Sequence, residues 1–211
     1  FGNRTEILLT APIFFTLLCS RAGAGKRLPA SAAFSAVPLL LGCATLWYNY
    51  VRFGTPFDFG YARIPGVLEE PWYRDGIFAF SAIPRNFQAM LLQGWRTLPN
   101  FPYLTPDPFG SSILLSSPFL ILALRPHARR WLRAGMAWLA VIVLTFLLWC
   151  HGNPGGWQYS YRYAMVLLPW FFVLLLESSP ERPGTFAWLL LATSIAINAW
   201  ATYLFYWTDY V

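Results

Sequence analysis

Arginine, aspartate and aromatic residues gather in the segment 48–66, which reads YNYVRFGTPFDFGYARIPG. A planar guanidinium group can donate two hydrogen bonds to a phosphate, so Arg52 and Arg63 are candidate ligands for a lipid-linked phosphate. Asp58 and Tyr61 are candidate contacts for a sugar or an acceptor. In the alternative interpretation, Arg52 reaches lipid headgroups and Asp58 pairs with a neighbouring arginine.

A second cluster of this kind occupies the segment 151–163, which reads HGNPGGWQYSYRY. A glycine-rich turn presents aromatic side chains around Arg162. These aromatic rings can stack on a sugar ring while Arg162 reaches an anionic group. The alternative is a belt of aromatic side chains at the membrane surface with one arginine that reaches the headgroups. The candidate sugar or acceptor contacts here are Trp157, Tyr159, Tyr161 and Tyr163.

Three further polar residues are candidate functional groups. Arg85 joins the candidate phosphate ligands, and Asp107 joins the candidate sugar or acceptor contacts. His151 has no serine or carboxylate at a spacing that suggests a catalytic partner, so an interfacial residue is the preferred interpretation. The carboxylates around these residues match no metal-binding motif, and the sequence therefore predicts no metal ligands.

The elements that must position these residues are long apolar blocks. Hydrophobic residues make up 57% of the 211 residues and charged residues only 11%, whereas soluble domains carry about 25% charged residues. The pattern predicts an all-α integral membrane protein with about six transmembrane helices in a single transmembrane domain, 1–211. The predicted spans are 7–19, 30–50, 111–124, 131–150, 161–176 and 185–207.

Charge in the loops predicts the orientation of these spans. The two basic loops, 20–27 and 125–133, fall on one side if the spans alternate, and the positive-inside rule places them in the cytoplasm. The outer loops are then 51–110 and 151–160. Basic residues that lie beside apolar spans face anionic lipid, so the net charge of +6 does not indicate a nucleic-acid partner.

The long outer loop contains its own structural signals. Apolar residues recur at helical spacing through 76–95, which predicts an amphipathic helix that lies in the membrane interface. The proline-rich stretch 99–108 excludes a helix and predicts extended or turn geometry. Ordered loops of this length usually carry function.

Four segments resemble the C-terminal half of bacterial membrane glycosyltransferases of the GT-C superfamily. This superfamily includes the dolichyl-phosphate-mannose-protein mannosyltransferases and the aminoarabinose transferases. The resemblance covers most of 47–170. The segments that carry it are RFGTPFDFGY, IPRNF before the proline-rich stretch, PDPFGSSILLSSPFLILAL and GGWQYSYRYAMVLLPW.

The resemblance implies transfer of a sugar from a polyprenyl-phosphate donor to an acceptor at the outer face of a bacterial plasma membrane. The chain begins at Phe1 without an initiator methionine, and we expect it to be a fragment that lacks the family's catalytic carboxylate in the first outer loop. The missing carboxylate would activate the acceptor hydroxyl as a general base. The arginines, with or without a divalent metal, would stabilise the leaving phosphate.

Two other classes of function compete with the glycosyltransferase. A transporter or flippase for a lipid-linked saccharide would place ionisable groups or broken helices near the bilayer midplane. Pro38 and Pro169 allow broken spans, but 131–150 carries no charged residue after Arg133. A structural membrane subunit would leave the loop that carries arginines and aromatic residues without a role.

Overall fold

The computed structural model describes residues 5–60, 63–126, 130–156 and 158–211. Most of these residues are helical, and the chain divides into two compact units, Phe1–Ile77 and Phe78–Val211. The predicted outer loop 51–110 therefore contributes its first part to unit 1 and its second part to unit 2. Each unit is described by itself below, and the single transmembrane domain over 1–211 stays a prediction.

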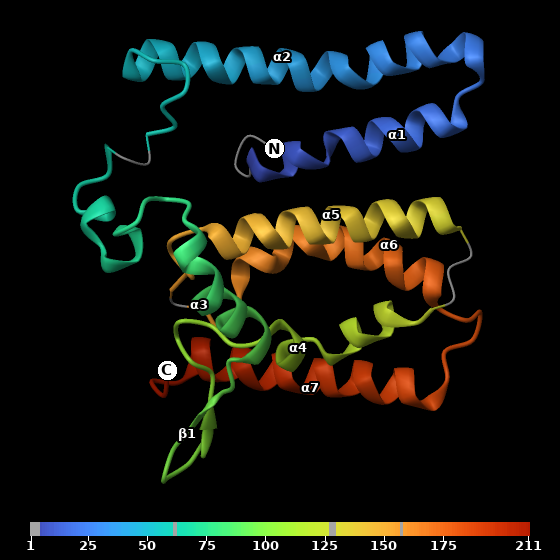
Figure 1. Cartoon of the computed structure of the whole chain (residues 1–211). Coiled ribbons are helices and arrows are strands. Elements are labelled where there is room, and N and C mark those ends of the chain that lie inside the picture. The colour runs from blue at the N-terminus through green and yellow to red at the C-terminus, as the bar shows by residue number, and fades with distance from the viewer. Residues whose placement is uncertain (1–4, 61–62, 127–129, 157) are drawn as a thin grey trace. The chain divides into compact units, whose positions relative to one another are not determined.

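Unit 1 is built on a pair of helices, α1 (Ala11–Arg21) and α2 (Arg27–Phe53), shown in blue in Figure 1. A 3-10 helix, Thr5–Thr10, leads into α1, and another, Ala24–Lys26, joins the two helices. Phe14 and Phe34 pack with their ring centroids 6.4 Å apart. α2 ends where Gly54 takes a left-handed conformation and donates its backbone N–H to the Tyr50 carbonyl, which glycine does without steric cost. Two 3-10 turns follow, Val67–Glu69 and Pro71–Tyr73.

Unit 2 is built around three longer helices, α5 (Trp131–Cys150), α6 (Leu168–Ser178) and α7 (Thr185–Trp207), drawn in yellow to red in Figure 1. Small residues on one face of α5 are buried and let α6 approach closely. At one end of this pair the Arg133 Nη1 lies 3.1 Å from the Glu177 Oε1. The buried alanines of α5 are Ala134, Ala137 and Ala140.

Shorter elements complete unit 2. They are a 3-10 turn, Phe80–Ala82, α3 (Ile83–Phe87), a π-helical turn, Gln88–Leu92, the antiparallel strands β1 (Arg96–Thr97) and β2 (Leu104–Thr105), α4 (Ile113–Ser116) and two 3-10 helices, Pro118–Leu124 and Arg162–Leu167. The hairpin formed by β1 and β2 is anchored on the end of α7, because the Phe101 ring packs edge-on against Trp200 and Tyr210.

In the part of the chain that the structure describes, three helices are long and apolar enough to cross a membrane. They include α5 and α7 entire, and α2 together with the turn before it, over Ala24–Phe53. An integral membrane protein is the fold class that these helices indicate. The other predicted spans, 7–19, 111–124 and 161–176, form shorter pieces: α1 and α6 have 11 residues each and α4 has four.

Proline explains part of this shortening. Each of the short spans changes helix type at a proline, namely Pro12, Pro118 or Pro169, which stands at the start of a helical piece. Proline has no backbone N–H and disfavours helical geometry in the residue before it, so one regular helix does not run through. The count of six spans stays a prediction.

The structure confirms a helical segment inside 76–95 but shortens it to Phe80–Leu92. Phe78 forms a β-bridge with His151, and the Ala79 N–H donates to the Cys150 carbonyl at 2.8 Å, so the chain before Phe80 is extended. The proline-rich stretch is largely extended or turned, as predicted. The parts of the two predicted outer loops that belong to unit 2 lie at the same end of α5.

Candidate functional site

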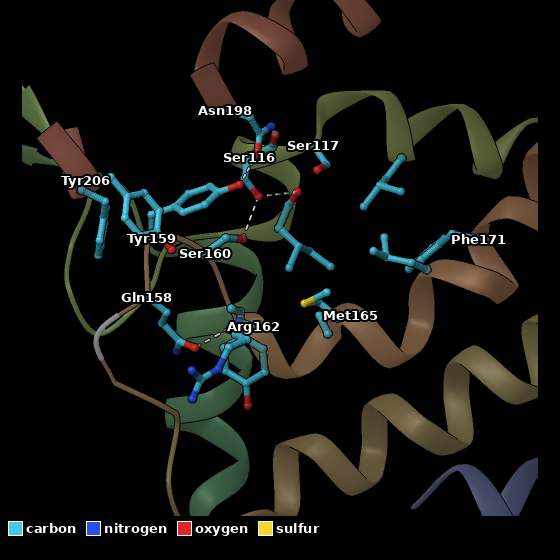
Figure 2. A pocket seen from close by; sticks show the side chains of 16 residues that line it. Ser116, Ser117, Gln158, Tyr159, Ser160, Arg162, Met165, Phe171, Asn198 and Tyr206 are labelled. Carbon is cyan, nitrogen blue, oxygen red and sulfur yellow. Dashed lines mark hydrogen bonds between the residues drawn. The ribbon is translucent and has the colours of Figure 1, made fainter. Parts of the chain in front are cut away.

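Unit 2 contains a cavity of about 440 Å³, which we call the α4–α7 pocket. Three parts of the chain line it: Ile113–Leu120 with α4, the segment from Gln158 to Phe171, and α7. Figure 2 shows Arg162 and Gln158 on one side of the pocket and Ser116 and Asn198 on the other. Its apolar lining includes Ile113, Leu120, Ala164, Met165, Leu168, Phe171 and Phe205.

Gln158 fixes the loop that carries the pocket's aromatic and basic residues. Its backbone N–H donates to the Pro108 carbonyl at 2.9 Å, and its side-chain Nε2 donates to the carbonyls of Phe109 and Pro154. Its Oε1 accepts the backbone N–H of Arg162 at 3.2 Å. Gln158 is buried, so these bonds replace water and hold the start of the 162–167 helix in place.

Glycine at position 155 is required for this arrangement. Gly155 has φ +103°, and a Cβ added there would lie 2.2 Å from the Gln158 Nε2. A side chain would therefore displace the Gln158 amide and strain the backbone.

Two serines join the segments 107–117 and 158–162. The Ser111 hydroxyl donates to the Tyr159 carbonyl, and the Ser111 carbonyl accepts the Tyr161 N–H at 3.0 Å. The Ser116 and Ser160 hydroxyl oxygens lie 2.7 Å apart. Two segments far apart in the sequence, PDPFGSS and QYSYRY, are thus held together by hydrogen bonds.

The polar wall of the pocket is a hydrogen-bonded group from three elements. The Tyr159 hydroxyl donates to the Asn198 Oδ1 of α7, and the Asn198 Nδ2 donates to the Ser116 carbonyl at 2.6 Å. Burial raises the pKa of Tyr159, and the neighbouring Tyr206 raises it further. The phenol therefore stays protonated and can donate at all physiological pH values.

Among the described residues that line the pocket, Arg162 has the only charged side chain. It is exposed, and its guanidinium carbon lies 5.8 Å from the centroid of the Tyr163 ring. Within the described ranges, no carboxylate forms an ion pair with Arg162. Its charge is therefore available to an anionic ligand at the pocket.

The predicted aromatic contacts of the 151–163 segment separate into different roles. Tyr159 lines the pocket and is half-buried. Tyr161 also lines it but is almost fully buried, with its hydroxyl directed to the Leu148 carbonyl at 3.3 Å. Tyr163 contacts the rings of His151 and Tyr161 and does not line the pocket. Trp157 lies outside the described residues.

Arg85 supports the structure of the 149–152 segment. Its Nη2 donates to the Gly152 carbonyl, and the neighbouring Asn86 donates to the carbonyls of Trp149 and His151 at 3.0 and 2.6 Å. Asn86 is fully buried. Arg85 does not line the pocket, and its hydrogen bond to Gly152 joins α3 to the segment that follows α5. His151 directs its Nδ1 to the Asn153 carbonyl at 2.9 Å, which is a loop contact.

In unit 1, Asp58 pairs with Arg63 over 2.7 Å, which is the alternative that the sequence left open. Arg63 also donates to the Phe53 carbonyl at 2.9 Å, so two local partners occupy its guanidinium. Arg52 donates to the Tyr48 hydroxyl at 3.0 Å and lies over the Phe53 ring. Tyr61 lies outside the described residues.

Asp107 is likewise committed to a local structure. Its Oδ2 accepts from the Arg96 Nε at 2.8 Å, and its Oδ1 accepts the Phe109 N–H at 2.8 Å. This aspartate therefore closes the turn that precedes Gly110 and does not line the pocket. Among the described residues, no group of three His, Cys, Asp or Glu side chains is placed to hold a metal ion.

Sequence reasoning missed the serines and the asparagine of the polar wall. Ser116 and Ser160 carry no motif, and only their contact across 44 residues makes them a pair. Asn198 offered a usable signal, because a strongly polar side chain inside an otherwise apolar helix is expensive in a membrane and usually has a partner or a function.

Comparisons with known proteins give no relative. No protein-family model matches the chain, and neither a curated protein nor a solved structure matches it. The α4–α7 pocket, with Arg162 at a polar wall and an apolar lining behind it, is therefore the strongest functional feature that the chain itself supplies.

Proposed function

We propose that this chain is part of a membrane glycosyltransferase that moves a sugar from a polyprenyl-phosphate donor to an acceptor at the outer membrane–water interface. The α4–α7 pocket receives the donor. Its apolar residues take part of the isoprenoid chain, and Arg162 contacts the phosphate. The observation that carries the proposal is the combination of Arg162, which forms no ion pair within the described ranges, with the largely apolar lining of the pocket.

Charge distribution in the helices favours a site at their ends over a path through their middle. α7 contains no charged residue, and α5 contains only Arg133, at its third position. Arg133 is paired with Glu177 near the end of α6. A transporter places ionisable groups near the bilayer midplane. The charges of α5 and α7 therefore do not support a transporter or flippase.

The proposal includes a topology. The three shorter helical regions complete six spans by tilting or by packing away from lipid. The loops 51–110 and 151–160 face outward from a bacterial plasma membrane, and the basic loops face the cytoplasm. Arg52 remains a second candidate for headgroup phosphate, since its contacts with Tyr48 and Phe53 leave its charge without a carboxylate partner among the described residues.

The test is binding of a photoreactive polyprenyl phosphate to the protein in liposomes. We expect crosslinks in the segments 113–120 and 158–171. Because hydrogen bonds to charged groups contribute about 1.5–3 kcal/mol, Arg162→Ala should weaken binding roughly 10- to 100-fold. Arg162→Lys should restore part of the affinity, since an ammonium keeps the charge without the planar fork.

The matched control is Arg182→Ala. Arg182 is also an exposed arginine, but it follows α6 where Arg162 precedes it, and it does not line the pocket. Binding should be unchanged in this variant. If the Arg162 and Arg182 variants lose affinity for polyprenyl phosphate equally, the loss comes from the general electrostatics of the membrane surface. Crosslinks outside the segments 113–120 and 158–171 would contradict a donor site in the pocket.

A further inference from the structure

Asn198 connects three elements around the α4–α7 pocket. Its Oδ1 accepts the Tyr159 hydroxyl, while its Nδ2 donates to the Ser116 carbonyl at 2.6 Å and to the Ser194 carbonyl at 2.7 Å. Ser194 lies one turn earlier in the same helix, but Ser116 and Tyr159 lie 82 and 39 residues away in sequence. One side chain thus ties α7 to α4 and to the loop before the 162–167 helix.

An asparagine at this point of α7 is costly unless its polar atoms are satisfied. Its neighbours along the helix, Ile197 and Ala199, are apolar. Both amide hydrogens and the amide oxygen have partners within the protein. Interhelical bonds of this kind stabilise membrane proteins only modestly, so stability alone gives a weak reason for the residue.

Tyr159, which donates its hydroxyl to Asn198, forms one wall of the pocket. The Tyr159 ring lies beside Phe205, with centroids 6.1 Å apart, and Tyr206 also lines the pocket (Figure 2). Tyr159 is half-buried, and its hydroxyl is held by the Asn198 acceptor. Without that acceptor the ring is held mainly by apolar contacts, which lack direction.

We infer that Asn198 is a positioning residue: by holding the Tyr159 hydroxyl it fixes one wall of the pocket and so sets the size of the anionic head group that the pocket admits. The inference rests on the proposed function for its ligand, a lipid phosphate. It concerns the discrimination between head groups, which Arg162 does not provide, because an arginine attracts a monophosphate and a pyrophosphate alike.

The first experiment compares binding of polyprenyl phosphate and polyprenyl pyrophosphate to the protein in liposomes. We expect Asn198→Leu and Tyr159→Phe each to shift the ratio of the two dissociation constants about fivefold toward the larger pyrophosphate, as loss of one neutral hydrogen bond allows. The double variant should show no further shift, because both changes remove the same bond. Thr193→Val, an exposed position of α7 outside the pocket lining, should leave the ratio unchanged.

A second experiment needs no lipid ligand. Ser117→Cys places a thiol in the pocket lining of a protein whose three native cysteines are replaced by serine, and its reaction with a water-soluble methanethiosulfonate is timed. Asn198→Leu and Tyr159→Phe should each accelerate the reaction by a similar factor, and together by no more than either alone. Tyr159→Phe retains the ring, so this arm remains decisive if Asn198→Leu does not fold.

The outcomes separate the two proposals. If neither lipid binds, the proposed function fails, and the thiol reaction alone decides the role of Asn198. Unchanged ratios with normal lipid binding overturn the positioning role and leave the proposed function standing. Additive effects of the two substitutions, in either experiment, also overturn it, since independent contributions are what a merely structural Asn198 would produce.

Discussion

The two arginine-bearing aromatic segments look alike in sequence and differ in structure. In 48–66 the guanidinium of Arg63 is held by the Asp58 carboxylate and the Phe53 carbonyl. In 151–163 the guanidinium of Arg162 has an aromatic neighbour and a cavity beside it. The guanidinium of Arg63 stabilises its own loop, whereas that of Arg162 lies beside the pocket, where we propose that it binds the ligand.

The difference shows that residue type and aromatic surroundings do not by themselves make an anion site. What distinguishes Arg162 is that its segment is fixed by other residues, chiefly Gln158, so that its own side chain is not needed to hold the loop. Arg63 performs that structural task in its segment. Within the described residues, the side chain of Arg162 is therefore free of a structural task in its loop, whereas that of Arg63 has one.

The largest effect that tests this contrast is expected at Gly155. Gly155→Ala puts a Cβ against the Gln158 amide at a positive φ, and overpacking and strain together should lower the free energy of unfolding by about 3 kcal/mol. Lipid-phosphate binding should be lost with the loop geometry. Thermal unfolding in detergent and binding of polyprenyl phosphate measure the two effects.

Gly66→Ala is the matched change in unit 1. Gly66 also has a positive φ of +78°, but a Cβ there meets no atom within 4 Å. Gly66→Ala should lower the free energy of unfolding by about 1 kcal/mol, which is the cost of a left-handed backbone conformation for a residue with a Cβ. If the two variants are equally destabilised, the fixed geometry around Gln158 is not what distinguishes the two segments.

A smaller effect is expected from the ion pairs of the two units. Glu177 retains 8% side-chain exposure beside Arg133, whereas Asp58 and Arg63 retain 21% and 52%. Arg133→Ala leaves a buried carboxylate unpaired and should cost about 3 kcal/mol or somewhat less, while Arg63→Ala should cost under about 1 kcal/mol. Chemical unfolding in detergent measures both.

Replacing both members of the buried pair tests the reason given for that cost. Arg133→Met combined with Glu177→Leu removes the unpaired charge, so this double variant should recover most of the lost stability. A double variant as unstable as Arg133→Ala would show that the two side chains contribute through packing and not through their charges.

The smallest expected effect is a pH response confined to the 54–66 loop. The hydrogen bond from Arg63 holds the pKa of Asp58 below its usual value, with help from the Gly60 N–H. A lowered folded-state pKa stabilises the loop above the unfolded pKa near 3.8, and this stabilisation is lost as the pH falls through the lower folded value. The protection factors of the loop amides, which correct for the intrinsic pH dependence of exchange, should therefore fall as Asp58 is protonated, and Asp58→Asn should remove this change.

Much of the helical framework could be predicted from the sequence. Three of the six apolar blocks became helices long enough to cross a membrane, and the boundaries of 131–150 and 185–207 agree with α5 and α7. The others are broken where Pro12, Pro118 and Pro169 begin new helical pieces. Hydropathy counts apolar residues over a window, and it does not register where one proline changes the backbone hydrogen bonding.

The site was predictable only in part. Arg162 and Tyr159 were found because their types carry chemistry, but Ser116 and Asn198 acquire a role only through partners 44 and 39 residues away. Such pairings depend on how helices pack, which local patterns do not encode. The phosphate-binding role of Arg63 stays a prediction, and its ion pair with Asp58 is the local alternative that the sequence leaves open.

The bonds from Asn198 have a consequence for the order in which the protein assembles. The residues of the pocket wall come together across separations of up to 82 residues, and Asn198 brings α7 into contact with α4. Contacts between residues far apart in sequence carry a high loop-closure cost and form late in folding. The wall of the pocket is therefore complete only when α7 has docked, so the assembly of unit 2 and the formation of the pocket are coupled.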